Sequence, residues 1–203
     1  EAWERLCKTN PLPEMTSRVC PAHCEGACTN GIDGLPVTIH YNERLISDKA
    51  FENGWVKEQG EPIEKTGKKV AVVGSGPAGL SAAWRLNKLG HAVTVYERQD
   101  AAGGLLMYGI PNMKLDKSIV AQRVKIMEEL GVKFIVNCNV GLDISFDELK
   151  NKYDAILLTG GATAPRDLNA PGRELDGIRF AVDFLTESTK TLLKDGYSSL
   201  KDT

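Results

Sequence analysis

The chain has 203 residues, 42% of them hydrophobic, and its 25 Lys and Arg nearly balance its 27 Asp and Glu. This balance gives no basic footprint for nucleic acid or acidic lipid, and the longest apolar runs are far shorter than a membrane span of roughly 20 residues. The start of the chain also lacks a basic-then-apolar signal peptide. We therefore expect a globular, cytoplasmic protein whose partners are neither nucleic acid nor membrane. Because the sequence begins at Glu1 without Met, we expect a fragment or processed product.

The first 56 residues show no sustained apolar period and carry four of the chain's prolines and three closely spaced cysteines. Such a segment needs something other than a large core to hold it together. Its opening EAWERLCKTN predicts the late turns of a helix, whereas VTIHYN, residues 37–42, is strand-like. The polar KEQGEPIEKTGK that follows, residues 57–68, predicts an exposed linker.

After the linker, apolar runs of strand and helix length alternate. KKVAVVG, the helix PAGLSAAWRLNKLG closed by Gly90, and HAVTVYE make one βαβ unit. The pattern then predicts a helix from Asp116 to Leu130, a strand VKFIV, a capping-box helix SFDELKNK, a buried parallel strand YDAILLTGG, and a helix FAVDFLTESTKTLLKDG. The fold class is therefore α/β, a Rossmann-like parallel sheet preceded by a mainly helical, cysteine-containing segment.

The motif GSGPAG, residues 74–79, lies between the first strand and its helix. Gly74 permits the tight turn, Gly76 lets the backbone approach a pyrophosphate, and Gly79 lets the helix pack close to the strand. Glu97 ends the next strand, where a carboxylate can accept hydrogen bonds from ribose hydroxyls. In this strand, turn and helix context, the motif predicts dinucleotide binding.

These residues carry a resemblance. GSGPAGL, Glu97, Gly103-Gly104 and LLTGGA resemble the FAD half of flavoproteins with two dinucleotide-binding domains. TNPLPEMTSRVCPAHCEGAC, GGLLMYGIPNMKLDK and GRELDGIRFAVDFL are similar to the small (beta) subunits of NADPH-dependent glutamate synthases. The resemblance implies FAD contacts, including a backbone contact to adenine at the last position, for the following residues: Gly74, Gly76, Pro77, Ala78, Gly79, Glu97, Gly104, Leu105, Gly109 and Val140.

The cysteines Cys20, Cys24 and Cys28 are each separated by three residues. This spacing is not the paired CxxC of common zinc sites, and an odd total of five cysteines argues against a disulfide scaffold, which leaves an iron-sulfur site, a zinc site or inert thiols. The resemblance favours ligation of a [4Fe-4S] cluster. A fourth ligand would come from Glu43, by similarity to dihydropyrimidine dehydrogenases, from Cys7, from His23 or from sequence upstream. Cys7 and Cys138 are interpreted as packed residues.

The resemblance implies three units: an incomplete iron-sulfur segment over 1–56, the linker 57–68, and over 69–203 the first half of an FAD domain leading into a missing NADPH domain. The implied function is electron transfer from NADPH through FAD and [4Fe-4S] clusters to a glutamate synthase large subunit, which makes glutamate from glutamine and 2-oxoglutarate. No side chain is assigned a catalytic role, because the cofactors carry the chemistry. Two alternatives are a flavin subunit of a ferredoxin-linked or pyrimidine-reducing oxidoreductase, and a non-catalytic nucleotide-binding docking module.

Overall fold

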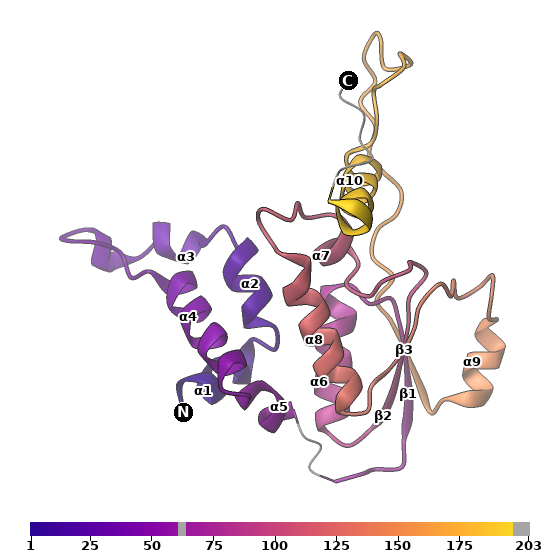
Figure 1. Cartoon of the computed structure of the whole chain (residues 1–203), viewed down its shortest axis with the longest axis horizontal. Helices are drawn as coiled ribbons and strands as arrows, with labels where there is room; N and C mark the ends of the chain where they lie inside the picture. Colours follow the sequence, from indigo (N-terminus) through magenta and orange to yellow (C-terminus); the bar gives the residue numbers. More distant parts are fainter. Residues whose placement is uncertain (61–63, 197–203) are drawn as a thin grey trace.

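A four-stranded parallel sheet organises the computed structural model, which describes residues 1–60 and 64–196 (Figure 1). The spatial order is β3-β2-β1-β4, with all neighbouring strands parallel. The strands are β1 (Lys69–Val73), β2 (Ala92–Tyr96), β3 (Lys133–Ile135) and β4 (Ala155–Leu158). This arrangement confirms the predicted Rossmann-like sheet.

Helices cover both faces of the sheet, as parallel strands require. Two helices, α6 (Pro77–Lys88) and α8 (Lys117–Glu129), lie on one face, and α9 (Phe146–Lys152) lies on the other (Figure 1). Asp116 caps α8 by accepting a hydrogen bond from the Ser118 amide, and α9 opens with the predicted capping box. The predictions of α6, α8 and α9 are therefore confirmed, and α8 and α9 begin directly after their N-cap residues.

The strand β4 differs from its prediction in burial. We expected a buried strand, but Leu157 and Leu158 are 38% and 67% exposed. The strand lies at the edge of the described sheet and packs against β1 on one side only. The apolar residues of β4 predicted the strand correctly. Its exposure could not be predicted from them, because it depends on which elements pack against the strand.

The first 60 residues are helical. They comprise α1 (Ala2–Thr9), α2 (Pro13–Val19), α3 (His23–Gly26), the 3₁₀ turn η1 (Thr29–Gly31), α4 (Ile39–Glu52) and α5 (Trp55–Gly60). The prediction of a strand-like run at 37–42 is wrong, because α4 begins at Ile39. Ser47 and Ala50 of α4 are fully buried, so packing outweighs the β propensity of its first residues.

The expected linker 57–68 is helical over its first four residues. Helix α5 continues to Gly60, which is buried. A Cβ added there would stand 2.2 Å from the Trp84 ring, so a side chain at this position does not fit without movement. Residues 61–63 of the expected linker fall outside the described ranges, and residues 64–69 are exposed.

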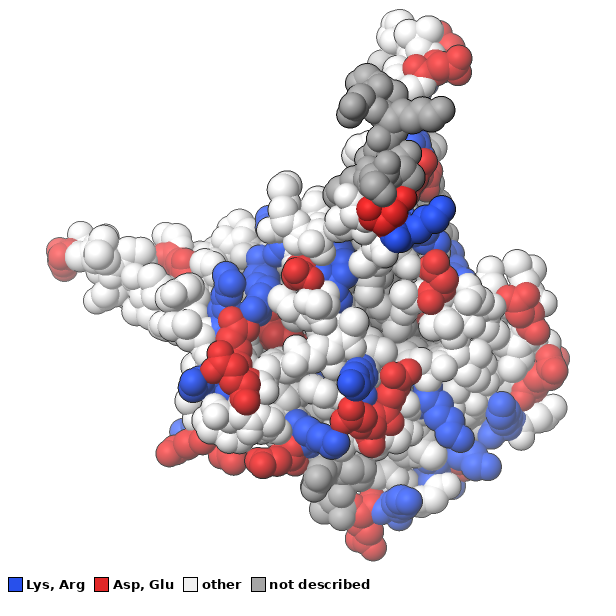
Figure 2. Space-filling model, viewed as in Figure 1, with Lys and Arg blue, Asp and Glu red and all other residues white. Residues whose placement is uncertain are grey.

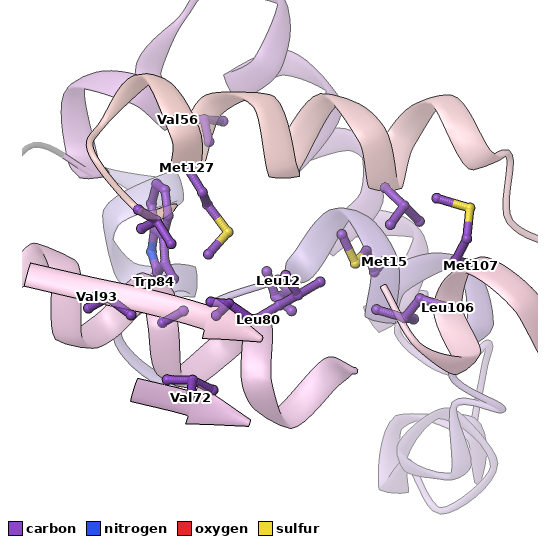
Figure 3. Close-up of a cluster of buried hydrophobic side chains, with 14 of the residues drawn as sticks. Leu12, Met15, Val56, Val72, Leu80, Trp84, Val93, Leu106, Met107 and Met127 are labelled. Atoms are coloured by element: carbon purple, nitrogen blue, oxygen red, sulfur yellow. The ribbon is translucent and has the colours of Figure 1, made fainter. Parts of the chain in front are cut away.

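One hydrophobic core joins the first segment to the sheet. Figure 3 shows Leu12, Met15 and Val56 of the first 60 residues in one cluster with Leu80 and Trp84 of α6. Met127 of α8, the strand residues Val72 and Val93, and Leu106 and Met107 complete the labelled cluster. The cysteine segment is therefore stabilised by a core that it shares with the parallel sheet.

Two further helices, α7 and α10, come after loops that leave the carboxyl ends of strands β2 and β4. The short α7 (Leu105–Tyr108) follows β2. Helix α10 (Ala181–Asp195), which follows β4 after the long loop of residues 159–180, contacts α7 (Figure 1). On the face shown in Figure 2, Lys and Arg are interspersed with Asp and Glu. Within the described ranges, no helix is both long and apolar enough to cross a membrane.

Candidate functional site

The glycine-rich turn between β1 and α6 has the geometry that its motif predicts. Gly74 has a φ of +98°, and a Cβ there would stand 2.5 Å from the Thr159 carbonyl oxygen. A Cβ at Gly79 would stand 1.9 Å from the Gly74 carbonyl oxygen. A Cβ at Gly76, in contrast, would meet no atom within 4 Å. Gly74 and Gly79 are thus required by the fold itself, whereas the open side of Gly76 leaves room for a ligand.

The start of α6 is suited to an anion. Gly76 is the N-cap and Pro77 the first helical residue, and Pro77 and Ala78 are exposed. The first amides of a helix have no partner within it, and the helix dipole adds positive potential there. The turn therefore fits the pyrophosphate of a dinucleotide, with Gly76 as the point of close approach.

Glu97 lies beside the turn, although its carboxylate is engaged within the protein. It is 5% exposed and accepts hydrogen bonds from the Ser75 amide at 3.0 Å, from the Ser75 hydroxyl at 2.5 Å and from the Gln99 amide at 2.9 Å. The predicted ribose contact of Glu97 stays a prediction. The arrangement fixes the carboxylate at the carboxyl end of β2, next to the glycine-rich turn of residues 74–79, here called the phosphate turn.

Ser75 links three parts of the site that sequence reasoning treated separately. Its hydroxyl donates to Glu97 and accepts from the Gly103 amide at 3.0 Å, so it joins the phosphate turn, the end of β2 and the Gly103–Gly104 loop. Ser75 is fully buried. Sequence reasoning missed it, because the motif leaves this position unspecified and nothing local marks it.

The Gly103–Ile110 loop, here called the flavin loop after its predicted role, packs against the phosphate turn. A Cβ added to Gly104 would stand 2.8 Å from the Cα of Gly76. Leu105 opens α7 and is 55% exposed, while Gly109 ends α7 and contacts the Leu105 side chain. The structure thus places Gly104 against the turn, while the FAD contacts of Gly104, Leu105 and Gly109 stay predictions.

A buried lysine under this loop was also missed. Lys117, the first residue of α8, is 2% exposed, and its ammonium donates to the carbonyls of Leu106 at 2.9 Å and Ile110 at 2.5 Å. Desolvation by burial lowers the Lys117 pKa from its ordinary value. Sequence reasoning had no signal for this role, because a lysine at a helix start is usually solvated.

The LLTGGA segment also reaches the site. The Thr159 hydroxyl donates to the carbonyls of Val73 and Gly74, each at 2.9 Å, so the TGG turn lies against the phosphate turn. Val140 lies elsewhere: it forms an isolated bridge with Ile144 and packs in the smaller core around Leu149. The described contacts do not join Val140 to the glycine turn, and its adenine contact stays a prediction.

The three clustered cysteines lie on successive short elements. Cys20 is the C-cap of α2, Cys24 is on α3, and Cys28 is the N-cap of η1. Cys20 and Cys24 are exposed and Cys28 is partly exposed, while Glu43 lies on α4. Within the ranges that the structure describes, these residues do not converge into a group of three or more metal ligands.

The local chemistry of Cys28 suits a metal ligand. Hydrogen bonds from backbone amides, first that of Val37 and then that of Asn30, lower the pKa of the Cys28 thiol. The thiolate is the form that ligates iron, so this environment fits cluster binding. The ligand roles of Cys20, Cys24, Cys28 and Glu43 nevertheless stay predictions.

The remaining cysteines have the packed positions that we expected. Cys7 is 5% exposed in the shared core, and desolvation raises the pKa of its thiol to about 11. Cys138 is partly buried, and desolvation likewise raises its pKa. Neither environment favours a thiolate, so neither residue has the character of a metal ligand.

Two family models match different parts of the chain. Residues 68–197 match pyridine nucleotide-disulphide oxidoreductases. Residues 1–55 match dihydropyrimidine dehydrogenase domain II, 4Fe-4S cluster. The first match covers more than half of the chain, and it contains the phosphate turn and the flavin loop.

Solved structures share the arrangement of the sheet. Mycobacterium tuberculosis FprA in complex with NADPH has a TM-score of 0.52 at 35% identity, over 59% of this chain and 28% of that one. A 2-naphthoyl-CoA reductase complex has a TM-score of 0.51 at 25% identity, over 68% of this chain and 21% of that one.

Curated relatives match almost the whole chain. The glutamate synthase [NADPH] small chain of Bacillus subtilis is 54% identical over 97% of this chain and 40% of its own length. The glutamate synthase [NADH] of Schizosaccharomyces pombe is 53% identical over 100% of this chain and 10% of its own length. The chain thus spans less than half the length of these relatives. It belongs to the pyridine nucleotide-disulphide oxidoreductase family and is a homologue of the glutamate synthase small chains, with an FAD-binding region preceded by a 4Fe-4S region.

Proposed function

We propose that this chain is the portion of a glutamate synthase small chain that carries electrons from FAD to a [4Fe-4S] cluster. One observation carries the proposal: Gly104 of the flavin loop lies against Gly76 of the phosphate turn, and Ser75 bonds the two segments together. A phosphate turn alone would serve any dinucleotide. A second glycine loop held against that turn supports a larger cofactor that extends along both segments.

In this proposal the protein's residues bind and orient the cofactors. Gly76, Pro77 and Ala78 would receive the pyrophosphate, with Gly74 and Gly79 shaping the turn. The ribose would lie near Glu97 and the adenine near Val140, while Gly104, Leu105 and Gly109 would line the flavin. Cys20, Cys24 and Cys28 would hold the cluster, with Glu43 as the proposed fourth ligand.

The full-length protein would also use NADPH and pass electrons to a partner. NADPH would supply two electrons to bound FAD as a hydride, and the clusters would pass them singly to the large subunit, where glutamine and 2-oxoglutarate would be converted to two glutamates. We place the protein in the cytoplasm, where a reducing compartment keeps its thiols free of disulfides. We divide it into the iron-sulfur segment 1–56, the connection 57–68 and the FAD half from 69 onward, which would lead into an NADPH domain.

A second candidate is a flavin subunit of a pyrimidine-reducing oxidoreductase. The family match over residues 1–55, whose name refers to dihydropyrimidine dehydrogenase, favours it. Steady-state assays of the full-length protein with its large subunit separate the two candidates. Oxidation of NADPH that depends on glutamine and 2-oxoglutarate supports glutamate synthase, whereas oxidation that depends on a pyrimidine supports the second candidate.

The cofactor assignment is tested by cysteine variants of the full-length protein, purified without oxygen. We expect Cys20→Ser, Cys24→Ser and Cys28→Ser each to lower iron and acid-labile sulfide, while Cys7→Ser, the matched control, leaves both unchanged. Glu43→Ala should lower or destabilise one cluster if Glu43 is a ligand. Full iron content in all three clustered variants, or zinc in place of iron, would refute the electron-transfer role of this segment.

A further inference from the structure

A buried ion pair joins the cysteine segment to the FAD-binding half. Arg123 of α8 donates from Nε to Oε1 of Glu14 and from Nη2 to Oε2 of Glu14, both at 2.7 Å. The side chains of Arg123 and Glu14 are 0% and 1% exposed, and the two residues are 109 positions apart. The pair is therefore a bidentate contact between two elements that are distant in the sequence and share one core.

Aromatic rings from both segments enclose the guanidinium. The Arg123 Cζ lies 4.6 Å from the centre of the Trp84 ring on α6 and 5.2 Å from that of Phe51 on α4. Within the described ranges, Nη1 of Arg123 has no hydrogen-bond partner. Bidentate bonding together with ring stacking leaves the guanidinium little rotational freedom, so the pair fixes orientation as well as distance.

Such a pair is weak evidence for stability. Removing two charges from water costs several kcal/mol per ion, and well-packed apolar residues of similar volume are often as stable or more stable. The charged pair instead specifies one arrangement of α2 relative to α8, because its two hydrogen bonds form only in that arrangement. The position of the pair in the fold indicates which sites depend on this arrangement.

Each partner lies on an element that leads to a proposed cofactor site. Helix α2, which carries Glu14, ends at Val19, and its C-cap is Cys20. Arg18 links this helix to α4, because its guanidinium donates hydrogen bonds to the Glu14 carbonyl and to the Asp48 carboxylate. Helix α8, which carries Arg123, begins at Lys117, whose ammonium binds two carbonyls of the flavin loop.

We propose that Glu14 and Arg123 are a positioning pair that sets the separation between the flavin loop and the cysteine segment for electron transfer. This inference rests on the proposed function. In the step concerned, one electron leaves the reduced flavin and one cluster gains it, and no atom is exchanged between the two sites. Because the rate of such a transfer falls steeply with separation, a small loss of register slows it without changing either cofactor.

The chain offers a matched control in a second ion pair between the same two segments. Lys57 of α5 binds Glu129 of α8 at 2.8 Å, but the two side chains are 52% and 39% exposed. An exposed pair contributes at most about 1 kcal/mol and holds its side chains loosely. Glu129→Gln therefore removes an ion pair that joins α8 to the first segment without disturbing the buried register.

The test uses the full-length protein, loaded with flavin and iron under anaerobic conditions. Rapid mixing with NADPH measures first the reduction of the flavin and then its reoxidation with reduction of the cluster. For Glu14→Gln we expect flavin-to-cluster transfer at least about tenfold slower per loaded molecule, a change of about 1.4 kcal/mol in barrier. Flavin reduction by NADPH and both midpoint potentials should be unchanged, and Glu129→Gln should match the wild type throughout.

A double variant, Glu14→Met with Arg123→Met, covers the case in which Glu14→Gln does not fold. It keeps an apolar contact and is expected to fold, to load both cofactors and to transfer electrons as slowly as Glu14→Gln. Wild-type transfer rates in either loaded variant, whatever the change in melting temperature, would overturn the positioning role alone. Absence of flavin-to-cluster transfer in the wild type would overturn the proposed function, and with it the role of the pair.

Discussion

Gly104 and Gly76 lie against each other, although they are 28 positions apart in the sequence. A Cβ on Gly104 would stand 2.8 Å from the Gly76 Cα and 3.2 Å from its amide nitrogen. This contact brings the flavin loop against the phosphate turn, while the space into which a Gly76 side chain would project stays free. The backbones of the flavin loop and the phosphate turn thus form one continuous surface at these two glycines.

We expect Gly104→Ala to weaken FAD binding by pushing the flavin loop off the turn. Because Gly104 has a φ of +53° and a ψ of −125°, a conformation that favours glycine, part of the effect is backbone strain of about 1–3 kcal/mol. Gly131→Ala is the matched control, since Gly131 has a φ of +101° but no atom within 4 Å of its Cβ. Flavin titration of both full-length variants checks this. Equal loss of affinity in the two variants would contradict a role for the contact.

Gly76→Val should abolish flavin binding while leaving the protein folded. Its φ of −63° is open to any residue, and its Cβ would meet nothing within 4 Å, so only a ligand is excluded. We expect a loss of several kcal/mol in FAD affinity through steric exclusion. Gly79→Ala provides the contrast, because its Cβ would collide with the Gly74 carbonyl and lower stability itself. Circular dichroism with flavin content measures both, and stoichiometric flavin in Gly76→Val would refute the assignment.

Lys117→Met should loosen the flavin loop. The change leaves the carbonyls of Leu106 and Ile110 without their donor, and an unsatisfied buried acceptor costs about 1–3 kcal/mol. We expect a lower melting temperature and faster flavin release in the full-length protein. Lys114→Met removes a neighbouring exposed lysine and should change neither quantity. Unaltered flavin release in Lys117→Met would show that the loop does not depend on this bond.

Cys7 should resist alkylation until the pH approaches its raised pKa of about 11. A thiol reacts as thiolate, so burial that raises the pKa keeps Cys7 protonated, and its reactivity should rise about tenfold per pH unit below that value. In urea, where burial is lost, the pKa returns toward its ordinary value and alkylation at pH 8 should become rapid. Mass spectrometry of the peptide that contains Cys7 measures both. Rapid modification of the native protein at pH 8 would contradict the packed position.

Local patterns determined much of the FAD-binding half. The apolar runs of β1 and β2, the glycine spacing from Gly74 to Gly79 and the capping box at Ser145 each act within a few residues, so the sequence shows them directly. The prediction of α10 succeeded for the same reason, since helical spacing and Gly196, in the left-handed conformation, lie within one segment. Propensity misled us at residues 37–42, because the packing of α4 against α2 decides that helix.

The sequence by itself determined that this protein has a parallel sheet with a dinucleotide turn and a separate cysteine segment. Only the tertiary structure decided how these parts meet: Ser75 bonding Glu97 and Gly103, Lys117 under the flavin loop, and Arg123 binding Glu14. Each of these contacts is made by a polar residue with no local signature. Its partner is chosen by burial, because a buried donor or charge must find an acceptor wherever the fold places one.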